Sequence, residues 1–480
     1  MERDARDLSP ATGLDTDLCI VGAGPAGIAI ACAFMGSAMD VVMLESGGRR
    51  NEPALQELNQ GSVEGDPYAG LHLTRHRQLG GAVNMWNTKV ENGIGGKFVP
   101  LDRHDLEQGN GGFATWPLAY AELEKYYQRA QAFCGLGFFA YDAEHWQSTL
   151  GTPPALPDQL VNRVYQFGRS ESLIGRYLRD LAKAGNVRLY HHATMRGLRT
   201  DRGGRRIVAV EATSGHNTPF QVRAKCVVLA GGAIENARLL LLSEEALVLG
   251  ESRQWVGRCF MEHPRDKSLQ LTPQSVAQVE ALAFFRRARS ADGVTVGGRI
   301  AVAEQAVSNE GVPAGSVSLI PQELPQKGTT RSHPRFRLVV NLEQGPNPEN
   351  QIVLGNRRDS LGLPRPVLRW RWRESEQLAV DRLRNGLVQW LGGLGSVEAV
   401  GDRHIDPNAH HHAGTTRMHQ DPAYGVVDSS CRVHGTDNLY VAGASTFPTS
   451  GWANPTLTIV AMALRLADRL RADLAPRTAG

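Results

Sequence analysis

Residues 410–418 read HHHAGTTRM, and residues 425–470 read GVVDSSCRVHGTDNLYVAGASTFPTSGWANPTLTIVAMALRLADRL. This stretch decides the fold, because one short segment holds a histidine cluster, an apolar run over 438–442 and an Asn-Pro-Thr sequence at 454–456. The apolar run predicts a strand, and the apolar periodicity after Asn-Pro-Thr predicts a helix over 456–470.

A glycine-rich turn near the other end of the chain is the second feature that indicates the fold. Residues 17–21 predict a buried strand, GAGPAG follows at 22–27, and residues 28–35 predict a helix. A second strand over 41–44 ends at Glu45, which lies 23 positions after Gly22. Strand, G-x-G-x-x-G and helix in this order predict a dinucleotide site at Gly22, Gly24 and Gly27, with Glu45 on a ribose. The alternative is a glycine turn beside a solvated glutamate.

The middle of the chain divides into a helical part and a β-rich part. Helices are predicted over 119–134 and 171–184, and a strand over 187–190. A second strand–glycine–helix unit is predicted over 225–242. Residues from about 268 to 372 are β-rich, and polar and apolar side chains alternate in the runs 335–341 and 368–373. This predicts one antiparallel sheet with a solvated or pocket-facing side. A helix follows over 374–391.

These elements predict an α/β fold class: a Rossmann-like dinucleotide-binding domain with a parallel sheet, and an α+β substrate domain on an antiparallel sheet. The discontinuous first domain is expected at 14–110, 185–265 and 425–475. The second is expected at 111–184 and 266–424.

Composition excludes several classes of protein. The chain has 480 residues, a net charge of +3 and no long basic run, so nucleic acid is not an expected partner. The cysteines are scattered without a C-x-x-C pair, which favours a reducing compartment over a disulfide framework. The charged N-terminus and the interrupted apolar runs predict no signal peptide and no membrane span, hence a cytoplasmic protein.

The motifs together resemble the glucose–methanol–choline (GMC) family of flavin oxidoreductases, and among its members the short bacterial proteins related to pyranose 2-oxidase. The resemblance covers nearly the whole chain. In chain order the matching motifs are GAGPAG with Glu45, LGGAVNMW, AGGAIENARLLLLS, VGRCFMEHP, EQGPNP, HHAGTTRM and NLYVAGASTFPTSGWANPTLT.

The resemblance implies FAD as cofactor and assigns residues to its parts. Gly22, Gly24 and Gly27 correspond to the pyrophosphate site, Glu45 to the ribose site and Thr194 to the adenine site. Gly80, Gly81 and Asn87 are expected along the flavin ring, and further cofactor-binding residues are Gly443, Ala444, Pro455 and Thr456. Relatives that bind flavin covalently carry a histidine where this chain has Met85, so non-covalent FAD is expected. Gly443 stands where many members carry an aspartate, so any side-chain contact with the cofactor at that position is lost.

Oxidising an alcohol requires a base for the hydroxyl proton, a group that orients the oxygen, and an acceptor for the hydride, here flavin N5. The resemblance nominates His411 as the base and Asn454 as its hydrogen-bonding partner. Neutral imidazole accepts a proton near physiological pH, and an amide both donates and accepts. The helix that begins after Pro455 would direct its positive dipole toward charge developing on the flavin.

Other roles for these residues remain open in the sequence. His412 is the competing base, and His263 could line the pocket or serve the structure. Asn454 could be only a helix cap. Three adjacent histidines cannot all face one ion on regular backbone, so no metal site is expected.

The sequence therefore predicts FAD-dependent oxidation of a small-molecule alcohol, favouring a sugar, a glycoside or a sugar-bearing natural product. Dehydrogenase is favoured over oxidase, with a separate electron acceptor: a quinone, a dye-like carrier or O2. Alternatives are a sterol, aromatic or choline-like alcohol, and an NAD(P)H-dependent flavin monooxygenase or reductase. A flavin-binding scaffold without activity is the non-enzyme alternative.

Overall fold

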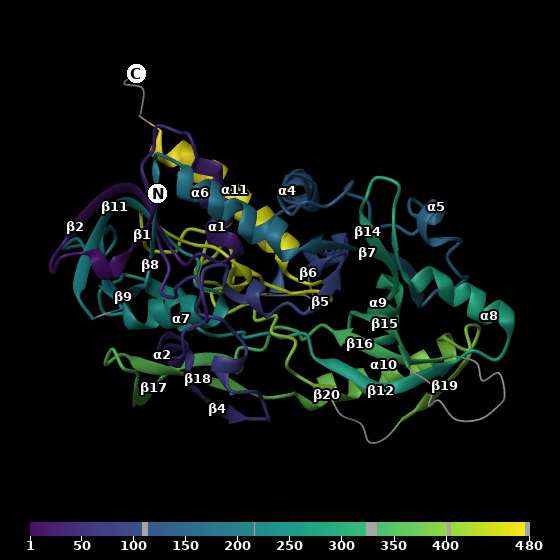
Figure 1. Cartoon of the computed structure of the whole chain (residues 1–480). Coiled ribbons are helices and arrows are strands. Elements are labelled where there is room, and N and C mark those ends of the chain that lie inside the picture. Colours follow the sequence, from purple (N-terminus) through teal and green to yellow (C-terminus); the bar gives the residue numbers. More distant parts are fainter. Residues whose placement is uncertain (108–113, 216, 323–333, 401–404, 476–480) are drawn as a thin grey trace.

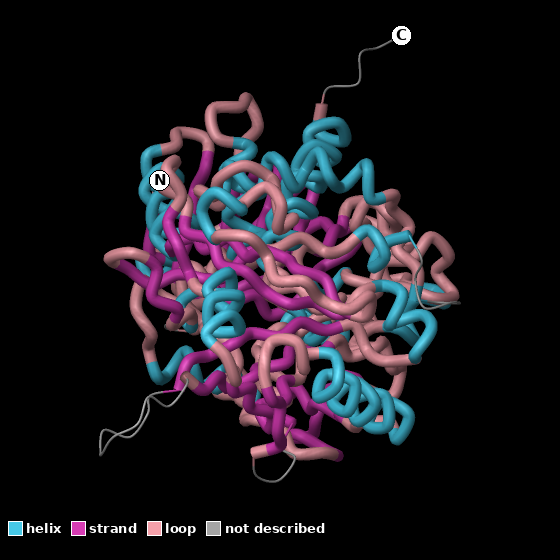
Figure 2. The backbone as a smooth tube through the Cα atoms, turned by 90° about the vertical axis from the view of Figure 1, so that its right-hand side faces the viewer, coloured by secondary structure: helices cyan, strands magenta, loops and turns pink. Residues whose placement is uncertain are grey.

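The computed structural model of the chain describes residues 1–107, 114–215, 217–322, 334–400 and 405–475. The fold is mixed α/β. A mainly parallel sheet and a larger antiparallel sheet lie at opposite ends of the molecule, and a small third sheet lies along one side (Figure 1). The strands run through the interior and most helices lie outside them (Figure 2).

The mainly parallel sheet is built around β2, whose last residues, Leu18 to Val21, are buried. A strand buried on both faces is expected to be continuously apolar, so this apolar run indicates a central strand of a sheet. In spatial order its strands are β1 (Glu2–Asp4), β8 (Val187–His191), β3 (Val41–Leu44), β2 (Gly13–Val21), β11 (Pro219–Leu229), β10 (Ile207–Ser214) and β9 (Ala193–Thr200), with β21 (Leu439–Val441) beside β11. Among these described strands only β10 runs in the opposite direction, antiparallel to both of its neighbours, β11 and β9.

Helices cover both faces of this sheet. On one face, α1 (Pro25–Phe34) packs against α6 (Arg176–Lys183) and α11 (Thr456–Leu474), and α11 in turn packs against α4 (Tyr120–Phe133). On the opposite side lies α7 (Ala233–Leu242) (Figure 1). β21 pairs with β11 and α11 packs against α1, so the C-terminal segment lies beside the helix that follows the N-terminal glycine turn.

The antiparallel sheet buries one face against α10 (Glu374–Trp390), where Leu383 and Leu387 join the same apolar cluster as Leu338 of β16. Phe336, Leu338 and Val340 are buried on one face, as the alternation predicted. In spatial order the strands are β19 (Ser396–Ala399), β12 (Arg265–Thr272), β16 (Arg335–Leu342), β15 (Gly315–Gln322), β14 (Thr295–Val302), β7 (Leu160–Arg169), β6 (Gly93–Phe98) and β5 (Thr88–Val90); β13 (Arg287–Arg289) pairs with β14 and β20 (Ile405–Asp406) with β12.

The prediction of one antiparallel sheet over 268–372 was wrong in its last part. β18 (Pro364–Trp370) pairs antiparallel with β17 (Gln351–Arg358) and parallel with β4 (Ser62–Gly65) in the separate small sheet. Alternation of side chains reports that a strand has two different faces, but not which strand lies beside it. The strand also ends at Trp370, before Arg371–Arg373.

Two further boundaries differ from the sequence expectation. The helix predicted over 171–184 begins with a π-helical turn, Glu171–Gly175, before α6. β5 and β6 lie in the antiparallel sheet, although their residues fall within the range 14–110 expected for the cofactor domain. The remaining short helices are α2 (Pro53–Gln56), α3 (Arg103–Glu107), α5 (Gln147–Leu150), α8 (Val276–Ala281) and α9 (Glu304–Glu310).

Among the described residues, no helix has both the length and the apolar character that crossing a membrane requires. All the cysteines are free thiols, and most are buried.

Candidate active site

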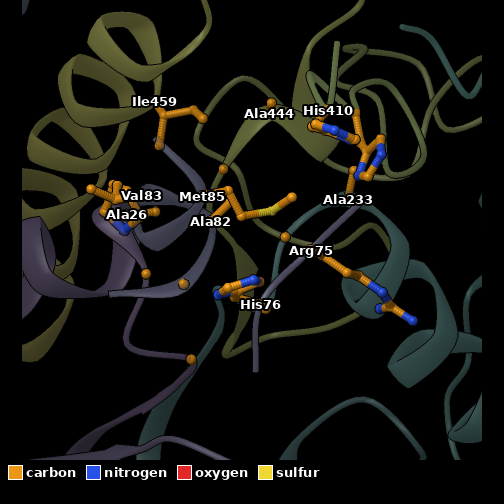
Figure 3. Close-up of a pocket in the computed structure, with 18 of the residues that line it drawn as sticks. Ala26, Arg75, His76, Ala82, Val83, Met85, Ala233, His410, Ala444 and Ile459 are labelled. Atoms are coloured by element: carbon orange, nitrogen blue, oxygen red, sulfur yellow. The ribbon is translucent and has the colours of Figure 1, made fainter. Parts of the chain in front are cut away.

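A cavity of about 590 Å³ lies between the two large sheets. Distant segments meet around it, including the residues Ala26, Met85, Ala233 and His410 (Figure 3). This volume is typical of a site for a small molecule or cofactor. The predicted cofactor residues that line it are Gly22, Gly24, Glu45, Gly81, Asn87, Thr194, Gly443, Ala444, Pro455 and Thr456. Both predicted catalytic residues, His411 and Asn454, line it too.

Gly27 and Gly80 are not among the lining residues, and the structure gives each another reason to be glycine. A Cβ on Gly27 would lie 2.0 Å from the carbonyl oxygen of Gly22, so this position lets α1 approach the turn. Gly80 has a φ of +94°, and its N–H donates to the carbonyl oxygen of Ala23 at 2.8 Å. Both residues therefore shape the wall without facing the cavity.

The glycine turn leaves backbone exposed at the start of α1. Gly22 has a φ of +111°, and a Cβ there would lie 2.5 Å from the carbonyl oxygen of Ala230. Gly24 precedes the first helical residue, Pro25, and a Cβ on it would meet nothing within 4 Å. The first N–H groups of a helix have no partner within it, so this open backbone can receive an anionic group.

Glu45 and Thr194 form the end of the cavity next to β3 and β9. The two carboxylate oxygens of Glu45 accept hydrogen bonds from the N–H groups of Ala23 (2.9 Å) and Gly47 (2.8 Å). Burial nevertheless raises the pKa of Glu45. The hydroxyls of Thr194 and Ser46 are 2.6 Å apart.

At the other end, a chain of hydrogen bonds fixes the orientation of His411. Its Nδ1 lies 2.9 Å from Nδ1 of His263, and Nε2 of His263 lies 2.7 Å from the carbonyl oxygen of Gly451. A carbonyl only accepts, so His263 carries its proton on Nε2, and its bare Nδ1 accepts from the Nδ1–H of His411. The Nε2 of His411 is therefore left with a lone pair, 3.2 Å from Nδ2 of Asn454.

This assignment requires both imidazoles to be neutral, and their surroundings keep them so. Burial lowers the pKa of His263 to about 4. Burial also lowers the pKa of His411 well below its usual value, with further contributions from His263 and Arg265. A neutral ring with a free Nε2 lone pair can accept a proton from a molecule in the cavity.

His412 faces a different set of groups. Its Nε2 lies 2.9 Å from the hydroxyl of Tyr68 and 3.4 Å from Oε1 of Glu262. The Tyr68 hydroxyl lies 2.6 Å from the same carboxylate oxygen and donates to it. The Nε2 of His412 therefore donates to the tyrosine oxygen, and burial lowers the pKa of this histidine to about 3. His411 and His412 thus point toward different partners, not toward a shared ion.

Glu262 is fully buried and organises the backbone of the histidine segment. Its carboxylate accepts from the N–H groups of His410, His411 and His263, each at 3.0 Å. Burial outweighs these bonds and raises the pKa of Glu262 to about 7. The motif VGRCFMEHP contains this residue, but the motif alone gives it no role.

Asn454 sits just before α11 and does not cap it. The residue at the cap position is Pro455, and no side chain makes a capping hydrogen bond there. The Asn454 amide is directed instead at His411. The alternative that Asn454 is only a helix cap therefore does not hold.

Family models described as GMC oxidoreductase match residues 160–265 and 346–463 of this chain. The chain belongs to the GMC oxidoreductase family. As a GMC oxidoreductase, it is an FAD-dependent enzyme that oxidises alcohols.

Individual relatives agree with this assignment. The chain is 25% identical to the fructose dehydrogenase large subunit of Gluconobacter japonicus, over 96% of this chain and 98% of that protein. It is 31% identical to pyranose 2-oxidase of Tricholoma matsutake over 26% of this chain and 22% of that protein. Among solved structures, an R554A variant of Aspergillus oryzae formate oxidase has the same fold, with a TM-score of 0.60 and 16% identity over 97% of this chain and 99% of that chain.

Sequence reasoning missed an ion network on the cavity wall of this GMC oxidoreductase. Glu235 pairs with Arg75 (2.8 Å), Arg77 (3.2 Å) and Arg238 (3.3 Å), and Arg238 also pairs with Asp359 (2.6 Å). Glu235 lies within the AGGAIENAR motif, so the motif marked the position without its partners. The surrounding arginines hold the pKa of Glu235 far below its usual range.

A histidine pair outside the cavity was also missed. Asp4, His191 and His192 place possible ligand atoms within 4.8 Å of one another at the edge of the parallel sheet. Arg6 already donates to both oxygens of Asp4, and Nε2 of His192 lies 2.7 Å from Glu52. The cluster is thus internally paired, and none of its three residues lines the cavity.

Proposed function

We propose that this enzyme oxidises a secondary or primary hydroxyl of a sugar or sugar-like compound, with His411 as base and Asn454 as the group that orients the oxygen. The observation that carries the proposal is the hydrogen-bond chain from Gly451 through His263 to His411. It leaves a lone pair on a buried neutral imidazole beside an amide donor.

The cavity suits FAD, since three glycines at its wall, Gly24, Gly232 and Gly443, border open space: a Cβ added to any of them would meet nothing within 4 Å. In our proposal the open N-terminus of α1 binds the pyrophosphate, and Glu45 and Thr194 bind the adenosine. Residues that would lie along the ring system are Gly81, Asn87, Gly443, Ala444, Pro455 and Thr456. Gly27 and Gly80 would support this surface from behind. FAD supplies the hydride acceptor.

The protein's own part in the reaction is to bind the hydroxyl and remove its proton. Asn454 Nδ2–H donates to the substrate oxygen, and Nε2 of His411 accepts the hydroxyl proton. A hydroxyl becomes strongly acidic while its carbon loses a hydride, so a base with a lowered pKa is sufficient. His412 does not serve as the base in this scheme, because its Nε2 donates to Tyr68.

The proposed domain division places cofactor binding and substrate binding in different parts of the chain. We propose that 14–110, 185–265 and 425–475 form a Rossmann-like FAD-binding domain, and that 111–184 and 266–424 form the substrate-binding domain. The parallel order of β1, β8, β3, β2 and β11 supports the first. Asn341 of β16 and the residues His410 to His412 line the cavity, which supports the second.

A carbohydrate-like substrate is supported by the relatives, one named for fructose and one for pyranoses. We further propose that FAD is held without a covalent bond, because the side chain on the cavity wall is that of Met85. Electrons would pass to a separate acceptor, either a quinone, a dye-like carrier or O2, and we favour a dehydrogenase.

The experiment is anaerobic mixing of the purified flavoprotein with sugars, glycosides and non-sugar alcohols, followed through the visible absorbance of oxidised flavin. Bleaching by one or more sugars or glycosides is expected. Bleaching only by sterol, aromatic or choline-like alcohols would refute the carbohydrate part. Bleaching by NADPH alone would favour a monooxygenase or reductase. Hydrogen peroxide formed in air as fast as dye is reduced would make the enzyme an oxidase.

A further inference from the structure

One wall of the cavity carries a lysine ammonium that no acidic side chain among the described residues neutralises. Lys97, on β6, lines the cavity together with Arg265 of β12 and Asn341 of β16. Within the part of the chain that the structure describes, the Lys97 ammonium has neither an ion pair nor a hydrogen bond. Partial burial of an ammonium without an anionic partner costs free energy, so a bound anion would stabilise it.

A second cation lies behind it. Lys97 Nζ is 5.9 Å from the centre of the Tyr165 ring, and the guanidinium carbon of Arg299 is 4.3 Å from the same ring. Arg299 is only 2% exposed, and its Nε and Nη2 have no hydrogen-bond partner among the described residues. The aromatic face compensates only a small part of the cost of burying these charges.

The neighbouring arginines affect the pKa of Lys97. Burial and the positive charges of Arg299, Arg287 and Arg265 lower the pKa of Lys97 to about 7. Arg265 also lowers the pKa of His411, so the cluster reaches the proposed catalytic histidine. Arg265 has an acidic partner, Asp406 at 2.7 Å, yet its Nε is buried without a hydrogen-bond partner in the described part of the chain.

We propose that Lys97, with Arg265 and Arg299 behind it, forms an anion subsite, and that the natural substrate is an acidic sugar whose carboxylate or phosphate pairs with Lys97. This inference rests on the proposed function, because it names the class of alcohol that the same cavity oxidises. The anion supplies the missing negative charge, and the sugar hydroxyl then lies toward His411 and Asn454.

Anion binding at Lys97 should be accompanied by proton uptake. Near pH 8 most Lys97 side chains are neutral, and pairing with an anion favours the charged form. Binding should therefore take up about one proton per anion. Calorimetric titration of the holoenzyme at pH 8, kept anaerobic and with its flavin reduced beforehand so that no probe is oxidised, measures this uptake in two buffers with different enthalpies of ionisation. The probes are D-glucuronate and D-glucose 6-phosphate, with D-glucose as the neutral counterpart.

Three substitutions make the test specific. Lys97→Gln should lose the preference for the anionic probes, on the order of tenfold to a hundredfold, because a charge-assisted bond is lost. Lys97→Arg should keep the preference but take up no proton, since arginine is already charged. Lys89→Gln, which removes an exposed lysine on the neighbouring strand β5, should behave as wild type.

The proposal is overturned if D-glucose binds as tightly as both anions, if no anion binds, or if Lys97→Gln keeps the preference. It is also overturned if Lys97→Gln changes only the reduction potential of the flavin, because the cations would then serve the cofactor. Preference for glucuronate alone or for the phosphate alone identifies the acidic group. Failure of every alcohol to reduce the flavin would instead refute the proposed function, with anion binding still measurable.

Discussion

His263→Leu should slow flavin reduction while leaving FAD bound. In wild type, His263 Nδ1 accepts the Nδ1–H of His411 at 2.9 Å, which keeps the proton off Nε2. Leucine cannot accept, so the buried N–H of His411 is left unpaired. The tautomer with its proton on Nε2 then becomes competitive, and that tautomer is not a base.

The size of the effect follows from the cost of one unsatisfied buried donor, about 1–3 kcal/mol. If this cost falls on the reactive tautomer, the reduction rate drops by roughly fivefold to 150-fold. Stopped-flow reduction under anaerobic conditions, at saturating substrate, measures the rate directly. His263→Gln is the matched control, because a glutamine oxygen can still accept from His411 and should restore part of the rate.

An unchanged reduction rate in His263→Leu, with normal FAD content and thermal midpoint, would refute the tautomer argument. Equal losses in the leucine and glutamine variants would mean that His263 matters through packing and not as an acceptor.

Three other predictions concern the cofactor and the buried acid. Gly22→Ala should lower FAD content and the thermal midpoint, because its Cβ would lie 2.5 Å from the Ala230 oxygen; normal flavin loading would contradict this. Acid denaturation should release all flavin from the polypeptide, because Met85 replaces the linking histidine, and retained yellow colour would show a covalent bond. Burial raises the pKa of Glu262 from 4.5 to about 7, so its contribution to folding is lost as pH rises through that range. The excess unfolding free energy of wild type over Glu262→Gln should be larger at pH 5 than at pH 8 by roughly 2–3 kcal/mol. Urea unfolding of both proteins at each pH checks this, and a difference independent of pH would contradict it.

The elements that could be predicted from the sequence are those whose structure depends on neighbouring residues in the chain. The apolar run before GAGPAG, the glycines of the turn and the Asn-Pro-Thr start of α11 each have a local physical cause. The pairing of His411 with Asn454 was also predicted, although only through resemblance, since 43 positions separate the two residues.

What the sequence did not predict depends on contacts between distant segments. His263 and Glu262 lie 148 or more positions from the histidines they hold, and the key acceptor at Gly451 is a backbone carbonyl, which leaves no mark in the sequence. The alternation around Trp370 was recognised, but its sheet was assigned wrongly because the partner strands come from elsewhere in the chain.

The most direct test of the account is anaerobic flavin reduction in His411→Ala and His412→Ala, compared with wild type at equal FAD content. We predict that His411→Ala loses at least about a hundredfold in reduction rate, the contribution expected of a general base, while His412→Ala retains most of it. Full activity in His411→Ala together with loss in His412→Ala would contradict the assignment of the base and the hydrogen-bond chain on which it rests.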